Sequence, residues 1–537
     1  MNDVNGPDFF YPGQRQATRV RTATRKRSAA RAAAALLLMY LVTMLALPCA
    51  AQSSSAASGD SAALSELQSQ VRELKEMVQQ LQQQTTASRA EITRLREELE
   101  ARRAAGNEAA TIDEQSPAYP STTAQLEQRL DHVEETQELL SGKIDDQYQT
   151  KVESASKYRI RLSGIVLFNL FGNSGSVDNQ DVPTWALTGP AETTGSVGAT
   201  MRQSILGFEA FGPDVFGAHT SADVNFDFGG GFAATTNGVD SGLVRLRTAA
   251  IRLDWKDTSV IAGQDQLFLS PLSPTSFASL IVPPLSYAGN LWAWTPQLRV
   301  EHRFALSSDS TVTLQGGLLD NLTGEPPDGD MYTWYRTPTA GELSRQPAYA
   351  VRAAYSHPLF GQTFTIGTGA YYSRENWGFN RNVDGWAATM DLNLPLGRKF
   401  ALSGEFYRGQ AIGGLGAALG RSVLYDGTLS GPNTQVVPLA VVGGWAQLKF
   451  RATPKLEFNG AFGQDSPFAS DIRYFGDQSQ SYAAFYLTAN RGAFGNVIYR
   501  PRSDLLFSME YRRLRTFNIY DSSSQAGQIN ASMGVLF

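Results

Sequence analysis

The chain has 537 residues, a formal net charge of -5 and 42% hydrophobic residues. This length accommodates two to four ordinary domains or one large barrel with appended segments. The acidic balance argues against general nucleic-acid binding, which needs a basic surface. After about the first fifty residues, no segment reaches the roughly 18 uninterrupted apolar residues of a membrane-spanning helix, so a helical membrane protein is excluded. A membrane β-barrel is not excluded, because every second residue of its strands is polar.

Residues 1–51 are typical of a secretory signal peptide. A basic stretch from Arg15 to Arg31 runs into AAAALLLMYLVTMLALPCAAQ (32–52), an apolar core followed by small residues. We expect cleavage after Ala51, which removes Cys49, the only cysteine of the chain. Pro48 argues against a lipid anchor on that cysteine. The mature chain would then need no disulfide chemistry.

Residues 52–103 are predicted to form a coiled coil. Apolar or small residues recur three and four positions apart, at Leu64, Leu67, Val71, Leu74, Val78, Leu81, Thr85, Ser88, Ile92, Leu95 and Leu99. A helix over 62–103 would be about 60 Å long and would hold subunits together. A solvated single helix is the alternative. β-branched residues at the first seam position with leucine at the second favour a dimer.

A linker at 104–124 contains Pro117 and Pro120 and is rich in small residues. A second, shorter coiled coil is predicted over 125–152, with its apolar residues at Leu126, Leu130, Val133, Leu140 and Ile144. Its register differs from that of the first coiled coil. After Lys157 the helical period gives way to a period of two residues that continues to the end of the chain, so 157–537 is interpreted as one β domain.

The β domain is predicted to have about sixteen strands. Their expected ranges are 158–171, 201–211, 218–228, 243–255, 258–268, 295–306, 310–320, 347–357, 362–374, 384–395, 399–411, 441–453, 455–465, 490–500, 504–516 and 527–537. Short turns such as PLGRK are expected to alternate strictly with long loops such as 172–200 and 412–440, which gives the barrel two different ends. An even number of strands closes without an edge, and only a closed sheet can cross a membrane. The fold class is therefore all-β, a transmembrane antiparallel β-barrel preceded by an α-helical coiled coil.

The chain ends in QINASMGVLF (528–537), in which apolar and polar residues alternate up to the terminal Phe537. A terminal phenylalanine after such a strand resembles the C-terminal signature of outer-membrane barrels. The stretches RQSILGF (202–208), LRTAAIRLDW (246–255) and AGQDQLF (262–268), and the order of segments, resemble trimeric porins, in particular the DcaP-like and phosphate-selective types.

This resemblance implies a homotrimeric porin in the outer membrane of a Gram-negative-type bacterium, with the coiled coil in the periplasm. It further implies contact with outer-membrane lipid, diffusion of small hydrophilic solutes through the barrel, and Phe537 as the assembly signal for the barrel assembly machinery. The coiled coil's dimer preference conflicts with the trimer. A second hypothesis is a plugged barrel that anchors a structural or adhesive coiled coil.

Candidate pore-lining residues are the charged residues opposite the apolar face of each strand. They are Arg159, Arg161, Asp223, Asp227, Arg299, Glu301, Arg303, Arg352, Asp391, Glu405, Lys449, Arg451, Glu457, Glu510 and Arg512. Opposed charges can screen solutes by size and charge, or they can simply neutralise one another across strands. The apolar, proline-rich loop 269–294 is expected to fold inward, with a subunit contact as the alternative.

Selectivity is not decided by charge, because acidic and basic residues are nearly equal in number after residue 157. Few of the basic residues are lysines, unlike a phosphate-selective pore. An arginine-lined path would suit carboxylates, because the planar guanidinium pairs well with them.

An enzyme, a metal site and a cofactor are not expected. His132, His219, His302 and His357 are scattered without metal-ligand spacing, and no G-x-S-x-G motif is present. GGLGAALG (413–420) is interpreted as a flexible loop, and DGD (328–330) as a solvated turn with weak Ca²⁺ binding as the alternative.

Overall fold

The computed structural model describes residues 159–537 except 189–194, 232–241, 326–335, 476–486 and 521. The predicted signal peptide, both coiled coils and the linker lie outside the described residues and stay predictions, as does the turn at 328–330. Among the described residues, no helix is long and apolar enough to span a membrane.

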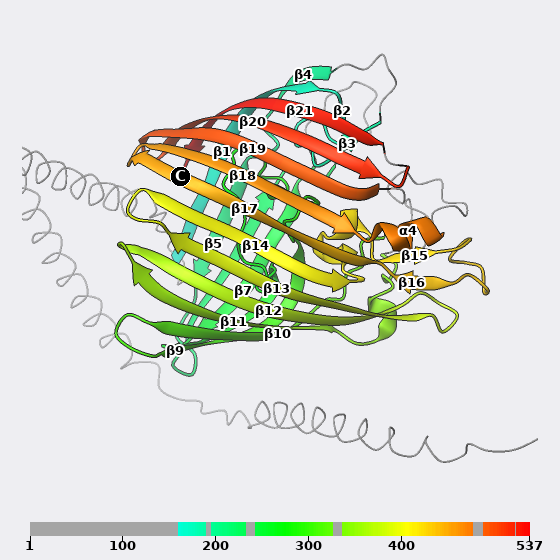
Figure 1. Cartoon of the computed structure of the whole chain (residues 1–537). Helices are drawn as coiled ribbons and strands as arrows, with labels where there is room; N and C mark the ends of the chain where they lie inside the picture. The colour runs from blue at the N-terminus through cyan, green and yellow to red at the C-terminus, as the bar shows by residue number, and fades with distance from the viewer. Residues whose placement is uncertain (1–158, 189–194, 232–241, 326–335, 476–486, 521) are drawn as a thin grey trace, which may run out of the picture. The chain divides into compact units, whose positions relative to one another are not determined.

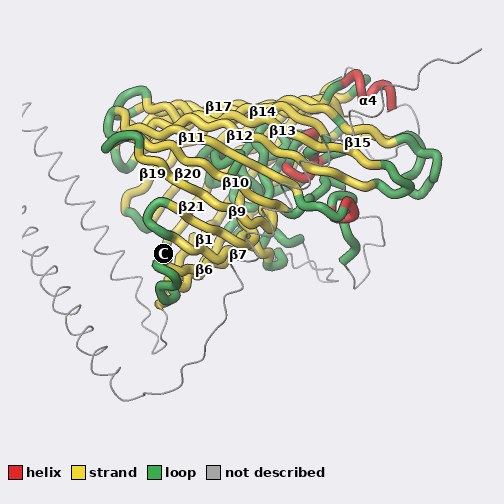
Figure 2. Tube along the Cα trace, turned by 90° about the horizontal axis from the view of Figure 1, so that it is seen from below, coloured by secondary structure: helices red, strands yellow, loops and turns green. Residues whose placement is uncertain are grey.

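The described chain forms a closed antiparallel β-barrel (Figures 1 and 2). Its wall consists of β1 (Arg159–Ser174), β4 (Gly195–Thr200), β5 (Ile205–Phe211), β6 (His219–Asp227), β7 (Arg245–Asp254), β8 (Thr258–Gln266), β9 (Trp294–Ala305), β10 (Thr311–Leu319), β11 (Ala348–Leu359), β12 (Gln362–Asn376), β13 (Asn382–Pro395), β14 (Phe400–Gln410), β17 (Ala440–Thr453), β18 (Leu456–Pro467), β19 (Leu487–Arg502), β20 (Leu505–Asn518) and β21 (Ser523–Leu536). Smaller elements are β2 (Ser176–Val177), β3 (Ala186–Leu187), β15 (Val423–Tyr425), β16 (Val436–Pro438), the helix α4 (Ala469–Phe475) and three short 3-10 turns (Glu342–Ser344, Gly413–Leu415 and Ala418–Gly420).

The seventeen strands of the sheet make sixteen crossings, because β4 and β5 follow one another beside β1. At the break between them, the Leu167 amide donates to the Ser204 hydroxyl at 3.0 Å, so a side chain continues the wall's hydrogen bonding. The barrel closes where β1 pairs with β21, with Leu167 opposite Gly534. Gly164 and Phe537 exchange backbone hydrogen bonds of 2.9 and 3.2 Å. The prediction of a closed barrel of about sixteen strands is confirmed, and the last strand lies beside the first.

The two faces of the wall differ as the alternation predicted. In β1, Ile160, Phe168 and Leu170 are exposed on the outside, whereas Leu167 and Asn169 are fully buried inside. This pattern suits a wall with an apolar surround and a filled interior.

The two ends of the barrel also differ, but the expected strict alternation of loop lengths does not hold. Figure 1 shows the C-terminus at the end opposite β15, β16 and α4, and the long connections gather with those elements. At this loop-bearing end, the connections 377–381 and 519–522 are nevertheless as short as the turns at the other end.

Two loops fill much of the interior. The inner loop (residues 267–293) connects β8 to β9, and the mouth loop (residues 411–422) follows β14. Nearly all of the mouth loop is buried, so the prediction that GGLGAALG is flexible is wrong. Glycines permit its close packing. A Cβ on Gly416 of the loop, whose φ is +88°, would lie 2.6 Å from the Trp292 ring, and a Cβ on the neighbouring Gly324, outside the loop, would lie 2.0 Å from the Gly420 carbonyl oxygen.

Candidate functional site

The inner loop follows the inside of the wall from strand to strand. The Thr389 hydroxyl of β13 donates to Leu269 O at 2.6 Å. Further along, Asn169 of β1 donates to Phe277 O at 2.8 Å, and Arg247 of β7 donates to Leu280 O at 2.6 Å. Successive loop residues therefore bind successive parts of the wall, and the loop lies inside the barrel as its composition predicted.

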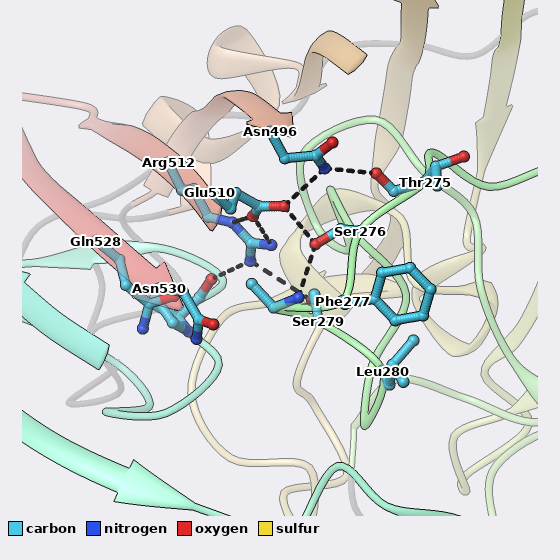
Figure 3. Close-up of polar contacts among 12 residues, drawn as sticks. Thr275, Ser276, Phe277, Ser279, Leu280, Asn496, Glu510, Arg512, Gln528 and Asn530 are labelled. Atoms are coloured by element: carbon cyan, nitrogen blue, oxygen red, sulfur yellow. Dashed lines mark hydrogen bonds and ion pairs between the residues drawn. The ribbon is translucent and has the colours of Figure 1, made fainter. Parts of the chain in front are cut away.

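One anchor of the inner loop is a buried ion pair on β20 (Figure 3). The Glu510 carboxylate accepts from the Ser276 hydroxyl at 2.5 Å and from Asn496 Nδ2 at 3.1 Å. Arg512 donates to the same carboxylate at 2.8 Å, while its Nη1 reaches the Ser279 hydroxyl at 3.5 Å. Both charges are almost fully buried, with side-chain exposures of 2% and 4%. They fasten the inner loop and are closed off from solvent.

Glu405 of β14 has the same role further around the barrel. It accepts from the Ser270 hydroxyl at 2.6 Å and from the Leu272 amide at 2.7 Å. The indole of Trp445 approaches the same carboxylate at 3.3 Å. This predicted site residue therefore holds the loop, whose own sequence from 267 to 293 contains no charged residue.

On the wall from β5 to β11, some charges are more exposed than these anchors and others are buried. At its loop-bearing end, Asp227 is fully buried beneath Arg245 and Arg247, which donate to it at 2.6 and 2.8 Å. Both guanidinium groups also lie over the Trp294 ring, at 4.9 and 4.5 Å from its centroid. The acid is fully covered, whereas Arg245 and Arg247 keep 26% and 13% of their side chains exposed, so guanidinium groups and not the carboxylate meet solvent at this point.

Further ion pairs continue along this wall. Arg252 lies 3.4 Å from both Asp223 and Asp265, and Arg299 lies 3.0 Å from Asp265. The remaining pairs are Arg303 with Glu301 at 3.0 Å and Arg352 with Asp391 at 2.7 Å. The arginines at positions 252 and 303 keep 33% and 38% of their side chains exposed, more than their acidic partners.

Five predicted residues lie near the end that bears Phe537. Arg161 pairs with Glu209 at 3.3 Å and keeps half of its side chain exposed. Arg159 is also exposed. Across the barrel, Lys449 and Arg451 lie 3.3 and 3.8 Å from Glu457. All fifteen predicted residues thus occupy the inner-face positions of their strands, but only some of them meet solvent.

Sequence reasoning missed Arg245, Arg247, Arg252 and Asp265. The pairing of β6 with β7 contains a bulge between Asn225 and Phe226, and this bulge shifts the alternation of β7 by one residue. The signal was visible, because the outward apolar residues of β7 change phase between Leu246 and Ile251. Arginines on both sides of that shift face inward. Asp265 lay within the strand predicted at 258–268 and was passed over.

A chain of aromatic rings stiffens the inner loop near the loop-bearing end. Trp185 contacts Tyr287, Tyr287 contacts Trp292 and Trp292 contacts Trp294, edge to face at centroid distances of 5.4 to 5.7 Å. No cluster of three or more metal-ligating side chains occurs among the described residues.

No protein-family model matches the chain, and no curated protein matches it in sequence. The solved outer membrane channel DcaP of Acinetobacter baumannii is similar with a TM-score of 0.53 and 14% identity, over 72% of this chain and all of that one (100%). The anion-selective porin from Comamonas acidovorans has a TM-score of 0.42 and 11% identity, over 71% of this chain and 100% of its own. Pseudomonas putida OprB has a TM-score of 0.43 and 12% identity, over 70% of this chain and 94% of its own. The chain has the DcaP-like porin fold that the resemblance implied.

Proposed function

We propose that the protein is an outer-membrane porin through which small hydrophilic solutes diffuse, with a preference for anions such as carboxylates. We extend the proposal to export with residues 1–51 removed, to a periplasmic coiled coil and to a homotrimer. The DcaP-like barrel fold supports the general role. The preference rests on the inner wall.

The observation that supports the anion preference is that, beside the inner loop, an acidic group is buried while the arginines paired with it are partly exposed. Asp227 is completely covered, while Arg245 above it keeps 26% of its side chain exposed. Arg252 and Arg303 are also more exposed than their partners, at 33% against 24% for Asp223 and 38% against 19% for Glu301. The inner loop accepts from Arg245 and Arg247 through its Ile281 and Leu280 carbonyls but contains no charged residue, so it offers no carboxylate to neutralise the guanidinium groups. Charges fixed in a narrow, low-dielectric passage set ion selectivity.

Reconstitution of the full-length mature chain in planar bilayers tests the proposal. We expect stepwise conductance and, across a salt gradient, a reversal potential on the anion side. A dicarboxylate added to one side should reduce the chloride current. In Arg252→Gln, which removes one exposed guanidinium, we expect unchanged conductance steps and a weaker anion preference. Absence of conductance steps would contradict the porin, and cation preference in the wild type would contradict the arginine path.

A further inference from the structure

The outside of the wall has a groove at β17 to β21 that the barrel itself does not fill. The groove has a volume of about 710 Å³ and is lined almost entirely by apolar groups. One row of register-paired residues crosses it: Leu448, Gly460, Gly495, Tyr511 and Ile529. A Cβ on Gly460 would meet no atom within 4 Å, and one on Gly495 only a backbone oxygen at 3.9 Å. Packing within the chain therefore does not require these glycines, and their effect is to leave space for something outside.

Above this groove, towards the loop-bearing end, three arginines point away from the barrel. Arg513 and Arg515 follow Tyr511 on β20 by two and four residues, about 7 and 13 Å along the strand. Arg491 of β19 lies directly opposite Arg515 in the register. All three are exposed, while the residues between them are buried. The basic cluster and the groove thus belong to one continuous surface.

The basic cluster has no acidic partner within the part of the chain that the structure describes. Arg491 and Arg513 donate to the glutamines Gln464 and Gln525, and Arg515 donates to the Ser523 hydroxyl. Arg491 and Arg515 lie over the same Phe517 ring, each 4.8 Å from its centroid. Like charges directly opposite each other destabilise a strand pair. A bound anion would remove that repulsion.

We infer that this surface binds an anionic, multi-acyl lipid of the outer leaflet, with phosphate groups on Arg491, Arg513 and Arg515 and an acyl chain in the groove over Gly460 and Gly495. The inference rests on the proposed placement of the barrel in an outer membrane. There the loop-bearing end faces outward, which puts the arginines at head-group depth and the groove among acyl chains. The separation of the basic cluster from the groove, about 7 Å, matches the short step from a phosphate to the start of an acyl chain.

Native mass spectrometry of the full-length mature protein in a neutral detergent tests this, with lipid A as the anionic probe and phosphatidylcholine as the zwitterionic one. We expect the wild type to retain lipid A and not phosphatidylcholine. The triple variant Arg491→Gln, Arg513→Gln, Arg515→Gln should bind lipid A about a hundredfold more weakly, because each basic residue near anionic head groups contributes about fivefold. Inorganic phosphate should not displace the lipid, since the acyl chain contributes as well.

The groove has its own variant and a matched control. Gly460→Leu with Gly495→Leu fills the space and should weaken lipid A binding about tenfold, by the loss of apolar contact. Gly316→Leu adds the same side chain at an outward glycine of β10, where the nearest atom is 3.9 Å away, and should have no effect. Conductance and the heat-dependent gel mobility of a folded barrel should be unchanged in all of these variants.

Unchanged lipid A retention in the triple variant would overturn the inference, as would equal retention of phosphatidylcholine. Displacement by phosphate would indicate a simple anion site. Dissociation of an oligomer by the groove-filling variant, without loss of lipid, would assign the groove to a second copy of the chain. Lipid binding is measured separately from conductance, so failure of the porin proposal would be recognised independently.

Discussion

The inner wall has two halves with the same alternation of inward and outward residues, but selected inward charges differ between them in their exposure to solvent. In the covered half, β12 to β21 with β1, the inner loop lies directly on Glu405, Glu510 and Arg512, and all three are buried. In the open half, β5 to β11, Arg252 and Arg303 keep about a third of their side chains in contact with solvent. An inward charge is therefore not by itself a pore charge. Where the inner loop lies on a charge, as on Glu405, Glu510 and Arg512, that charge fastens the loop and does not meet the solute.

The difference has a physical origin in the loop's composition. A loop without charged side chains still presents backbone amides and carbonyls, and these need partners when they are buried. The covered half supplies them through carboxylates and amides, such as Glu405 for the Leu272 amide and Asn496 for the Thr275 carbonyl at 2.8 Å. In the open half, Arg245 and Arg247 of β7 donate to the Ile281 and Leu280 carbonyls, whereas Arg252 and Arg303 keep contact with solvent.

The largest effect is expected from Glu510→Gln in the covered half. This change leaves Arg512 buried beside a neutral amide, and breaking a buried ion pair in this way costs about 3 to 5 kcal/mol. Urea unfolding of the protein in detergent micelles, followed by tryptophan fluorescence, should show this decrease in the free energy of unfolding. Single-channel recordings should become noisier because residues 275–280 are less firmly held.

The double variant Glu510→Gln, Arg512→Gln is the control for this effect. It removes both charges, so no uncompensated charge stays buried, and most of the stability should return. A single variant as stable as the wild type would show that the pair does not fasten the loop.

The sequence predicted the fold well because the signal for a membrane strand is local. All sixteen wall crossings correspond to predicted ranges, since each range alternates apolar and polar residues on its own. β7 shows the limit of that signal. Its bulge depends on pairing with β6, and a fixed alternation through 243–255 cannot place Arg252 on the same face as Arg245 and Arg247.

The covered and open halves could not be separated from the sequence, because that division depends on contacts between residues far apart in the chain. Glu510 meets Ser276 across 234 positions, and no local pattern links the two. The composition of GGLGAALG was equally ambiguous. Glycines permit a flexible loop, but they also permit backbone segments to approach closely, and here Gly416 lies against Trp292.

A smaller effect on stability and a clear one on transport are expected from Arg303→Gln in the open half. Its guanidinium is 38% exposed and pairs with Glu301 on the same strand, so the free energy of unfolding should change by no more than about 0.5 kcal/mol. The reversal potential in a salt gradient should move towards cation preference, because Glu301 is then unopposed.

Arg408→Gln is the matched control, since Arg408 points outward over the Phe468 ring and should not affect selectivity. An equal shift in both variants would mean that the overall charge of the protein, and not the open half, sets the preference. A large loss of stability in Arg303→Gln would remove the distinction between the halves.

The smallest effect is expected at the mouth loop, where Glu325 accepts from the Ser422 and Val423 amides at 2.7 and 3.0 Å. Burial raises the pKa of this carboxyl above its ordinary value, although the two amides act against the shift. The charged groups nearest to it are Glu375 from β12 and Arg421 from the mouth loop. Because the pKa is higher in the folded state, the packing is most stable below the ordinary pKa and weakens as the pH rises through the raised one.

Amide hydrogen exchange at Ser422 and Val423, corrected for intrinsic rates, should therefore be slower at about pH 5 than at about pH 8. Glu325→Gln keeps an acceptor for both amides and cannot ionise, so the difference between the two conditions should disappear. If the difference in exchange between the two pH values persists in Glu325→Gln, the titrating group is Glu375 of β12, and this residue controls the packing of the mouth loop. Exchange at Thr275 and Ser276 in the inner loop should not depend on Glu325, because their partners lie on the covered half of the wall.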